Sequence, residues 1–157
     1  MPQAVKSWRT LSPAIIGFLG VIVGASISTG ANYVLAVRKE NADAARYELL
    51  RAQEFKVSAR LITGDFAAAI GSLDAVLQLK VWLPGMAGGF QMSAWQRDAA
   101  VMARELSREE WQLVSSAAHA AEVFRMYPKE GEVPPLDAAQ QVRAKLQAGI
   151  NALQPYV

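Results

Sequence analysis

Cysteine is absent from this sequence of 157 residues, and histidine occurs only once. The lack of cysteine excludes disulfide bonds, thiolate zinc sites and cysteine nucleophiles. Charged residues are also scarce, at 19% of the chain, compared with about 25% in typical soluble domains. Apolar residues, by contrast, make up 52% of it. This composition excludes a disordered or collagen-like chain and leaves few side chains for catalysis.

The scarcity of charge is concentrated in one stretch, because no residue from position 10 to position 37 is charged. A helix needs about 20 mostly apolar residues to cross a bilayer, and residues 11–37 supply such a run. Ser12 and Pro13 form a helix start signal, with serine as the N-cap and proline in the first turn. We therefore predict a transmembrane helix over residues 11–37, preceded by an N-terminal tail of residues 1–10.

Side chains suited to a membrane surface flank this stretch. Trp8 lies just before it and Tyr33 lies near its end, and amphipathic aromatic residues favour the headgroup level. Arg38 and Lys39 follow directly, and Lys and Arg are more numerous on this side of the stretch than on the other. Because Lys and Arg near a span favour the cytoplasm, we predict a single-pass protein of the cell membrane with a cytoplasmic C-terminal part.

Two other interpretations fit the same stretch. A cleaved signal peptide would use the basic residues Lys6 and Arg9 and the small residues at positions 25–31. However, apolar residues resume at positions 33–37, which favours an uncleaved anchor. A buried core helix is the second alternative, but a charge-free run of this length exceeds what the core of a small domain usually needs.

Small residues form one face of the predicted span. They are Gly17, Gly20, Gly24 and Ser28. Gly20 and Gly24 make a GxxxG match, and such a face lets another helix backbone approach closely in lipid. We therefore expect the span to pack against a second copy of the chain or against another membrane protein.

A long juxtamembrane helix is predicted over residues 38–82. Its apolar stripe has alternating spacings of four and three residues, which is typical of an amphipathic helix. The stripe consists of Phe55, Ala59, Ile62, Phe66, Ala69, Leu73 and Val76. An apolar loop over residues 83–92 should follow, with Trp82, Leu83 and Phe90 packed into the end of a bundle.

Three further helices are predicted within residues 93–157. Ser93, Ser107 and, more loosely, Asp137 each begin a capping-box pattern. Short connections between amphipathic helices favour antiparallel neighbours. The predicted fold class is therefore all-α, with an N-terminal transmembrane helix that continues into an antiparallel helical bundle with coiled-coil-like packing.

The sequence offers little catalytic chemistry. His119 shares a polar stripe with Glu122 and should face water. Asp65 and Asp74 are nine residues apart, so they should point to opposite faces of their helix. We found no catalytic, phosphate-binding or metal-binding pattern, and therefore predict neither an enzyme nor a cofactor. Basic residues are interleaved with acidic ones and match no nucleic-acid-binding motif, and no small-molecule substrate is evident.

These observations predict a non-catalytic, membrane-anchored helical scaffold or interaction module. Its expected partners are the lipid bilayer and either a second copy of the chain or another membrane protein. The alternatives are an accessory subunit of a larger membrane complex and a secreted helical binding domain released by signal-peptide cleavage.

Overall fold

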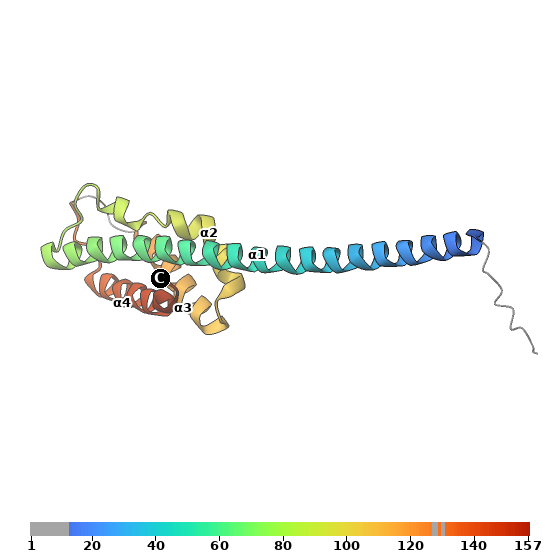
Figure 1. Cartoon of the computed structure of the whole chain (residues 1–157). Helices are drawn as coiled ribbons and strands as arrows, with labels where there is room; N and C mark the ends of the chain where they lie inside the picture. The colour runs from blue at the N-terminus through green and yellow to red at the C-terminus, as the bar shows by residue number, and fades with distance from the viewer. Residues whose placement is uncertain (1–12, 127–128, 130) are drawn as a thin grey trace, which may run out of the picture. The chain divides into compact units, whose positions relative to one another are not determined.

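A computed structural model describes residues 13–126, 129 and 131–157 (Figure 1). The elements in chain order are α1 (Pro13–Leu79), the 3-10 turn η1 (Met86–Phe90), α2 (Ser93–Glu105), α3 (Arg108–Phe124), α4 (Leu136–Leu153) and the 3-10 turn η2 (Gln154–Tyr156). No strand occurs within these described residues. The prediction of an all-α fold is therefore confirmed.

The chain divides into two units, residues 1–48 and residues 49–157. In the first unit, every side chain that the structure describes is exposed. Large apolar side chains are among them, with exposed fractions of 67% for Phe18, 70% for Val21 and 71% for Tyr33. The predicted tail of residues 1–10, including Trp8, lies outside the described residues.

The second unit has a hydrophobic core to which each of its helices contributes. The residues that α1 contributes are the ones that the sequence spacing predicts, namely Phe55, Ala59, Ile62, Phe66, Ala69, Leu73 and Val76. α1 ends at Leu79, three residues before its predicted end at residue 82. The helix stops there because Lys80 adopts a left-handed backbone conformation, with φ of 55°. The Lys80 amide still donates a hydrogen bond to the carbonyl of Val76, at 2.8 Å.

The segment after α1 differs in two ways from the predicted apolar loop of residues 83–92. It contains η1, a short 3-10 turn, and Leu83 is 40% exposed rather than buried. Trp82 and Phe90 are buried as predicted. Their rings lie 5.6 Å apart and both contact the ring of Phe124, at 6.1 and 5.7 Å between centroids. Two rings from the segment after α1 and one from the end of α3 therefore pack together at this end of the core.

Two of the three predicted capping boxes are wrong. α2 begins at Ser93 itself, without a side-chain cap, and α4 begins at Leu136, which places Asp137 inside its first turn. The third prediction is confirmed, since the Ser107 hydroxyl accepts from the Glu110 amide and the Glu110 carboxylate accepts from the Ser107 amide. Of the three predicted capping residues, only Ser107 occupies the N-cap position, where its backbone has the extended conformation that capping requires.

A carboxylate from α1 takes the place of the missing cap on α2. Oδ2 of Asp65 accepts a hydrogen bond from the Ala94 amide, at 2.8 Å. In α2, Met102 and Asp98 are buried, whereas Trp95 is only half-buried. The ring of Trp95 instead stacks on that of Trp111 of α3, with 5.2 Å between centroids.

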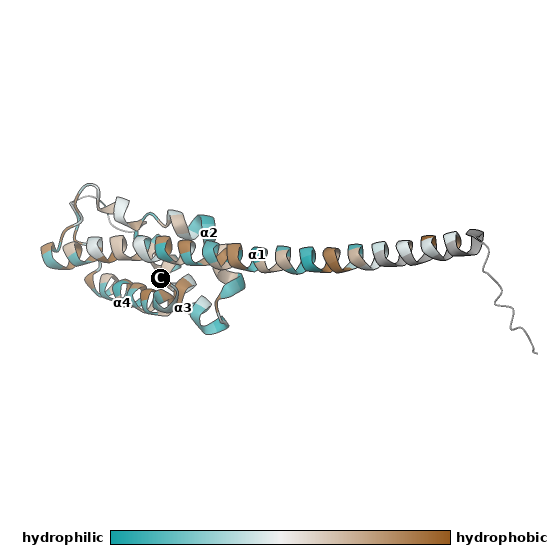
Figure 2. Ribbon diagram, viewed as in Figure 1, coloured by the Kyte–Doolittle hydropathy of each residue, from teal (hydrophilic) through white to brown (hydrophobic). Residues whose placement is uncertain are grey.

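α4 packs against both α3 and α1. Gly149 permits the approach, because a Cβ atom there would lie 2.7 Å from the ring of Phe66 and 3.0 Å from Cβ of Ala117. Hydrophobic and hydrophilic residues are interspersed along α4 (Figure 2), and its buried residues recur every three or four positions, as expected for an amphipathic helix. The buried residues of α3 and α4 are Val114, Ala117, Ala118, Ala121, Phe124, Ala139, Val142, Leu146, Gly149 and Leu153.

Candidate functional site

The small-residue face of α1 has no neighbour within the described residues. A Cβ atom added at Gly17, Gly20 or Gly24 would meet nothing within 4 Å, and Ser28 is exposed. At about 100° per residue, these four positions fall within an arc of about 80° on the helix. The four small residues therefore share one exposed face of α1.

One helix of the described chain is long and apolar enough to cross a membrane. The same length and composition also fit the core helix of a soluble protein or a signal sequence. Tyr33, Arg38 and Lys39, which the sequence assigns to the membrane surface, are all exposed on α1.

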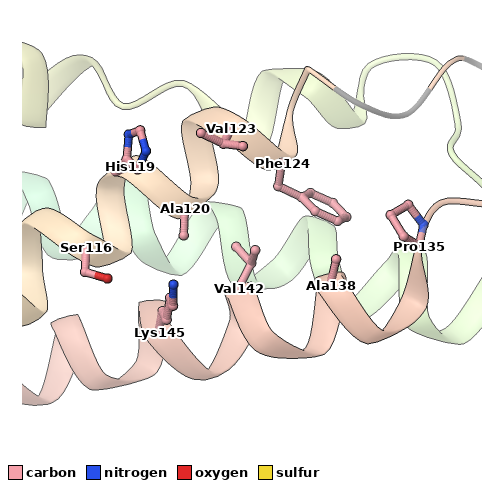
Figure 3. Close-up of a pocket in the computed structure, with 9 residues that line it drawn as sticks. All are labelled: Ser116, His119, Ala120, Val123, Phe124, Pro135, Ala138, Val142 and Lys145. Carbon is pink, nitrogen blue, oxygen red and sulfur yellow. The ribbon is translucent and has the colours of Figure 1, made fainter.

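An open groove of about 450 Å³ runs between α3 and α4 (Figure 3). Its lining consists of Ser116, His119, Ala120, Val123, Phe124, Pro135, Ala138, Val142 and Lys145. Most of these side chains are apolar, and we call this feature the α3–α4 groove. Figure 3 shows Ser116 and Lys145 toward one end of it, and Phe124 and Pro135 toward the other.

The polar end of the α3–α4 groove is cationic. No acidic residue lines the groove, and Lys145 forms no ion pair or hydrogen bond within the part of the chain that the structure describes. His119 lies at the rim and is exposed, which confirms the prediction that it faces water. A ligand with an anionic head and an apolar body would match both ends of the groove.

Three ion pairs occur among the described residues, and two of them join α1 to other helices. Arg143 of α4 donates to Asp74, whereas Asp65 faces α2. The two carboxylates therefore serve different helices, which confirms that they do not form a pair. Arg51 of α1 pairs with Glu105 at the end of α2.

Asp98 is the one carboxylate buried among the described residues. Hydrogen bonds from the neighbouring Arg97 guanidinium, at 2.7 and 2.8 Å, lower its pKa below the ordinary value, and a hydrogen bond from the Ser58 hydroxyl acts in the same direction. The charge is thus satisfied by its neighbours, and Ser58 ties α1 to α2.

The carboxylate of Glu110 joins the start of α3 to the end of the chain. It accepts from the phenol of Tyr156, at 2.9 Å, in addition to its capping contacts with Ser107. These hydrogen bonds, first those with Ser107, lower the pKa of Glu110, and the contact with Glu110 raises the pKa of Tyr156.

Within the described ranges, no group of three or more His, Asp or Glu residues is arranged to hold a metal ion. No protein family, no curated protein and no solved structure matches this chain.

The α3–α4 groove is the feature that sequence reasoning missed. The sequence correctly predicts that His119 faces water, but nothing in it indicates that Lys145 lies across from α3. The residues that line the groove come from two separate stretches of the sequence, 116–124 and 135–145. Only the packing register of α3 against α4 brings them together, so no local pattern could have revealed the groove.

Proposed function

We propose that this protein is a non-catalytic, membrane-anchored helical scaffold or interaction module. The observation that carries the proposal is the exposure of a charge-free helical stretch. Residues 13–37 contain no charged side chain, and the apolar side chains described there, such as Phe18 and Val21, are exposed. Exposed apolar surface of this extent is unfavourable in water, and it marks a membrane or protein contact.

Fractionation combined with intact-mass measurement tests the anchor. We expect the full-length chain in the membrane fraction, released by detergent but not by high salt or alkaline carbonate. A mature chain that begins near Ala31 or Asn32 would instead identify a cleaved signal peptide and a secreted domain. A full-length chain that stays in solution would exclude the anchor.

We further propose that the part of the chain after α1's apolar stretch is cytoplasmic. Arg38 and Lys39 and the basic residues that follow support this orientation. Because the chain has no cysteine, a single Ser93→Cys variant gives one thiol to follow. In closed cells, a membrane-impermeant maleimide should leave this thiol unmodified until the membrane is permeabilised. Modification of this thiol in intact cells would show that the C-terminal part lies outside the cell instead.

The small-residue face of α1 is proposed as the contact with a second copy of the chain. Close backbone approach across such a face stabilises helix pairs in lipid. Replacing Gly20 and Gly24 together with isoleucine should therefore lower the oligomer size in mild detergent. Gly30→Ile is the matched control, because Gly30 is also exposed and lies about 120° around the helix from Gly24. Equal oligomer size in all three proteins would contradict self-association through this face.

An accessory role in a larger membrane complex is the alternative partner arrangement. Here the same face would contact a different membrane protein. Other chains would then elute with this protein in fixed proportion, and the double isoleucine variant would release them. A single homogeneous species would argue against it.

The helices of the second unit are proposed to form an antiparallel bundle. The direct contact between α3 and α4 supports this arrangement. Contacts of α1 with both α2 and α4, through Asp65 and Phe66, support it as well.

A further inference from the structure

We propose that the α3–α4 groove binds a fatty acid, with its carboxylate at Lys145 and Ser116 and its alkyl chain along the apolar end. This site goes beyond the scaffold function proposed above and does not depend on it. Nothing in the sequence pattern of either helix assigns it.

The carboxylate end follows from the donors that the groove presents. The ammonium of Lys145 and the hydroxyl of Ser116 both donate hydrogen bonds, and Figure 3 shows them at the same end of the groove, from facing helices. A carboxylate has two acceptor oxygens, so it can satisfy one donor from each helix. Lys145 has no ion-pair partner within the described chain, so a bound carboxylate would not have to displace one. No acidic residue lines the groove, so none would repel the carboxylate there.

The alkyl end follows from the rest of the lining. Between the polar end and the ring of Phe124, the surface consists mainly of apolar side chains such as Val142 and Ala138, with His119 at the rim. Ser116 and Phe124 are eight residues apart on α3, which corresponds to about 12 Å along the helix. A straight alkyl chain of medium length fits this distance, and the cavity of about 450 Å³ lies in the range of small-molecule sites.

Most of the affinity should come from the chain rather than from the charge. Burial of each methylene group strengthens binding about fourfold. An exposed ion pair such as that of Lys145 strengthens it only about two- to fivefold. The carboxylate contact therefore selects the head group and orients the ligand, while the apolar lining retains it.

Photo-crosslinking tests the site in the full-length protein. The chain would be reconstituted in phosphatidylcholine vesicles and exposed to decanoic acid that carries a diazirine on its chain, and labelled peptides would be mapped by mass spectrometry. We expect label on α3 and α4 at the groove. The probe also dissolves in the bilayer, so label on residues 13–37 would show separately that this segment lies in the lipid. If residues 13–37 carried no label, the membrane anchor would be contradicted, but the test of the groove would be unaffected.

Variants and an uncharged probe separate specific binding from general apolar contact. Lys145→Gln should lower the label in the groove about two- to fivefold, whereas Lys56→Gln, an exposed lysine of α1, should leave it unchanged. Ala138→Trp fills the groove and should abolish the label there. The corresponding decanol probe, which carries no charge, should label the groove weakly and to the same extent in the wild-type and Lys145→Gln proteins.

Absence of label from the groove in the wild-type protein would overturn the proposal. So would equal labelling of the wild-type and Lys145→Gln proteins. Circular dichroism checks that each variant folds, and Lys145→Gln changes only an exposed side chain. The charge test therefore remains decisive even if Ala138→Trp disturbs the fold.

Discussion

Gly149 offers a sharp test of how α4 packs in the second unit. A Cβ atom at this position would lie 2.7 Å from Cε2 of Phe66, a residue with no exposed surface. Carbon atoms pack best at about 3.5–4.0 Å, so the ring would have to move by about 1 Å. Gly149→Ala should therefore strain the contact between α4 and α1.

Gly71→Ala is the matched control. Gly71 also lies inside a helix, but it is exposed, and a Cβ atom there would meet nothing within 4 Å. Both variants gain about 1 kcal/mol of helix propensity. Only Gly149→Ala incurs the cost of overpacking, about 1–3 kcal/mol. The difference between the two variants should therefore be about 1–3 kcal/mol in the free energy of unfolding, with Gly71→Ala the more stable.

Thermal unfolding in detergent measures this difference. Three of the four tryptophans, Trp82, Trp95 and Trp111, lie in the second unit, so the change in tryptophan fluorescence follows the unfolding of that unit. For a unit of this size, each kcal/mol shifts Tm by about 4 °C or more. Equal Tm values for the two variants, or a higher Tm for Gly149→Ala, would show that α4 does not pack on Phe66 as described.

Three further predictions concern polar groups of the second unit. Asp65→Ala removes the acceptor of the Ala94 amide and should lower the free energy of unfolding by about 1 kcal/mol in denaturant titrations; an unchanged midpoint would show that the cap contributes nothing. Thr63→Val should raise the free energy of unfolding by about 1 kcal/mol, because Oγ1 of Thr63 is buried without a hydrogen-bond partner among the described residues. A lower free energy of unfolding in this variant would show that the hydroxyl has a partner. Because folding lowers the pKa of Glu110, its stabilising contribution is present above the ordinary carboxyl pKa and is lost as the pH falls through the folded value. Melting between about pH 5 and pH 3 should then depend less on pH in Glu110→Gln than in the wild type, and parallel curves would contradict this.

Features that depend on neighbours in the sequence were predictable. The spacing from Phe55 to Val76 identified the residues of α1 that are buried, because the helical period alone decides which side chains share a face. The capping box at Ser107 was predictable for the same reason, since its two hydrogen bonds join residues three apart. The charge-free stretch and its small-residue face are likewise properties of the linear sequence.

Contacts between helices were decided only in the tertiary structure. Ser93 had the local pattern of a cap, yet Asp65, from another helix, accepts the hydrogen bond at the start of α2. Lys145 and Ser116 come to the same end of a groove because Gly149 lets α4 approach α1 and α3 closely. Such pairings depend on how side chains of different helices fit together, and no periodicity within one helix contains that information.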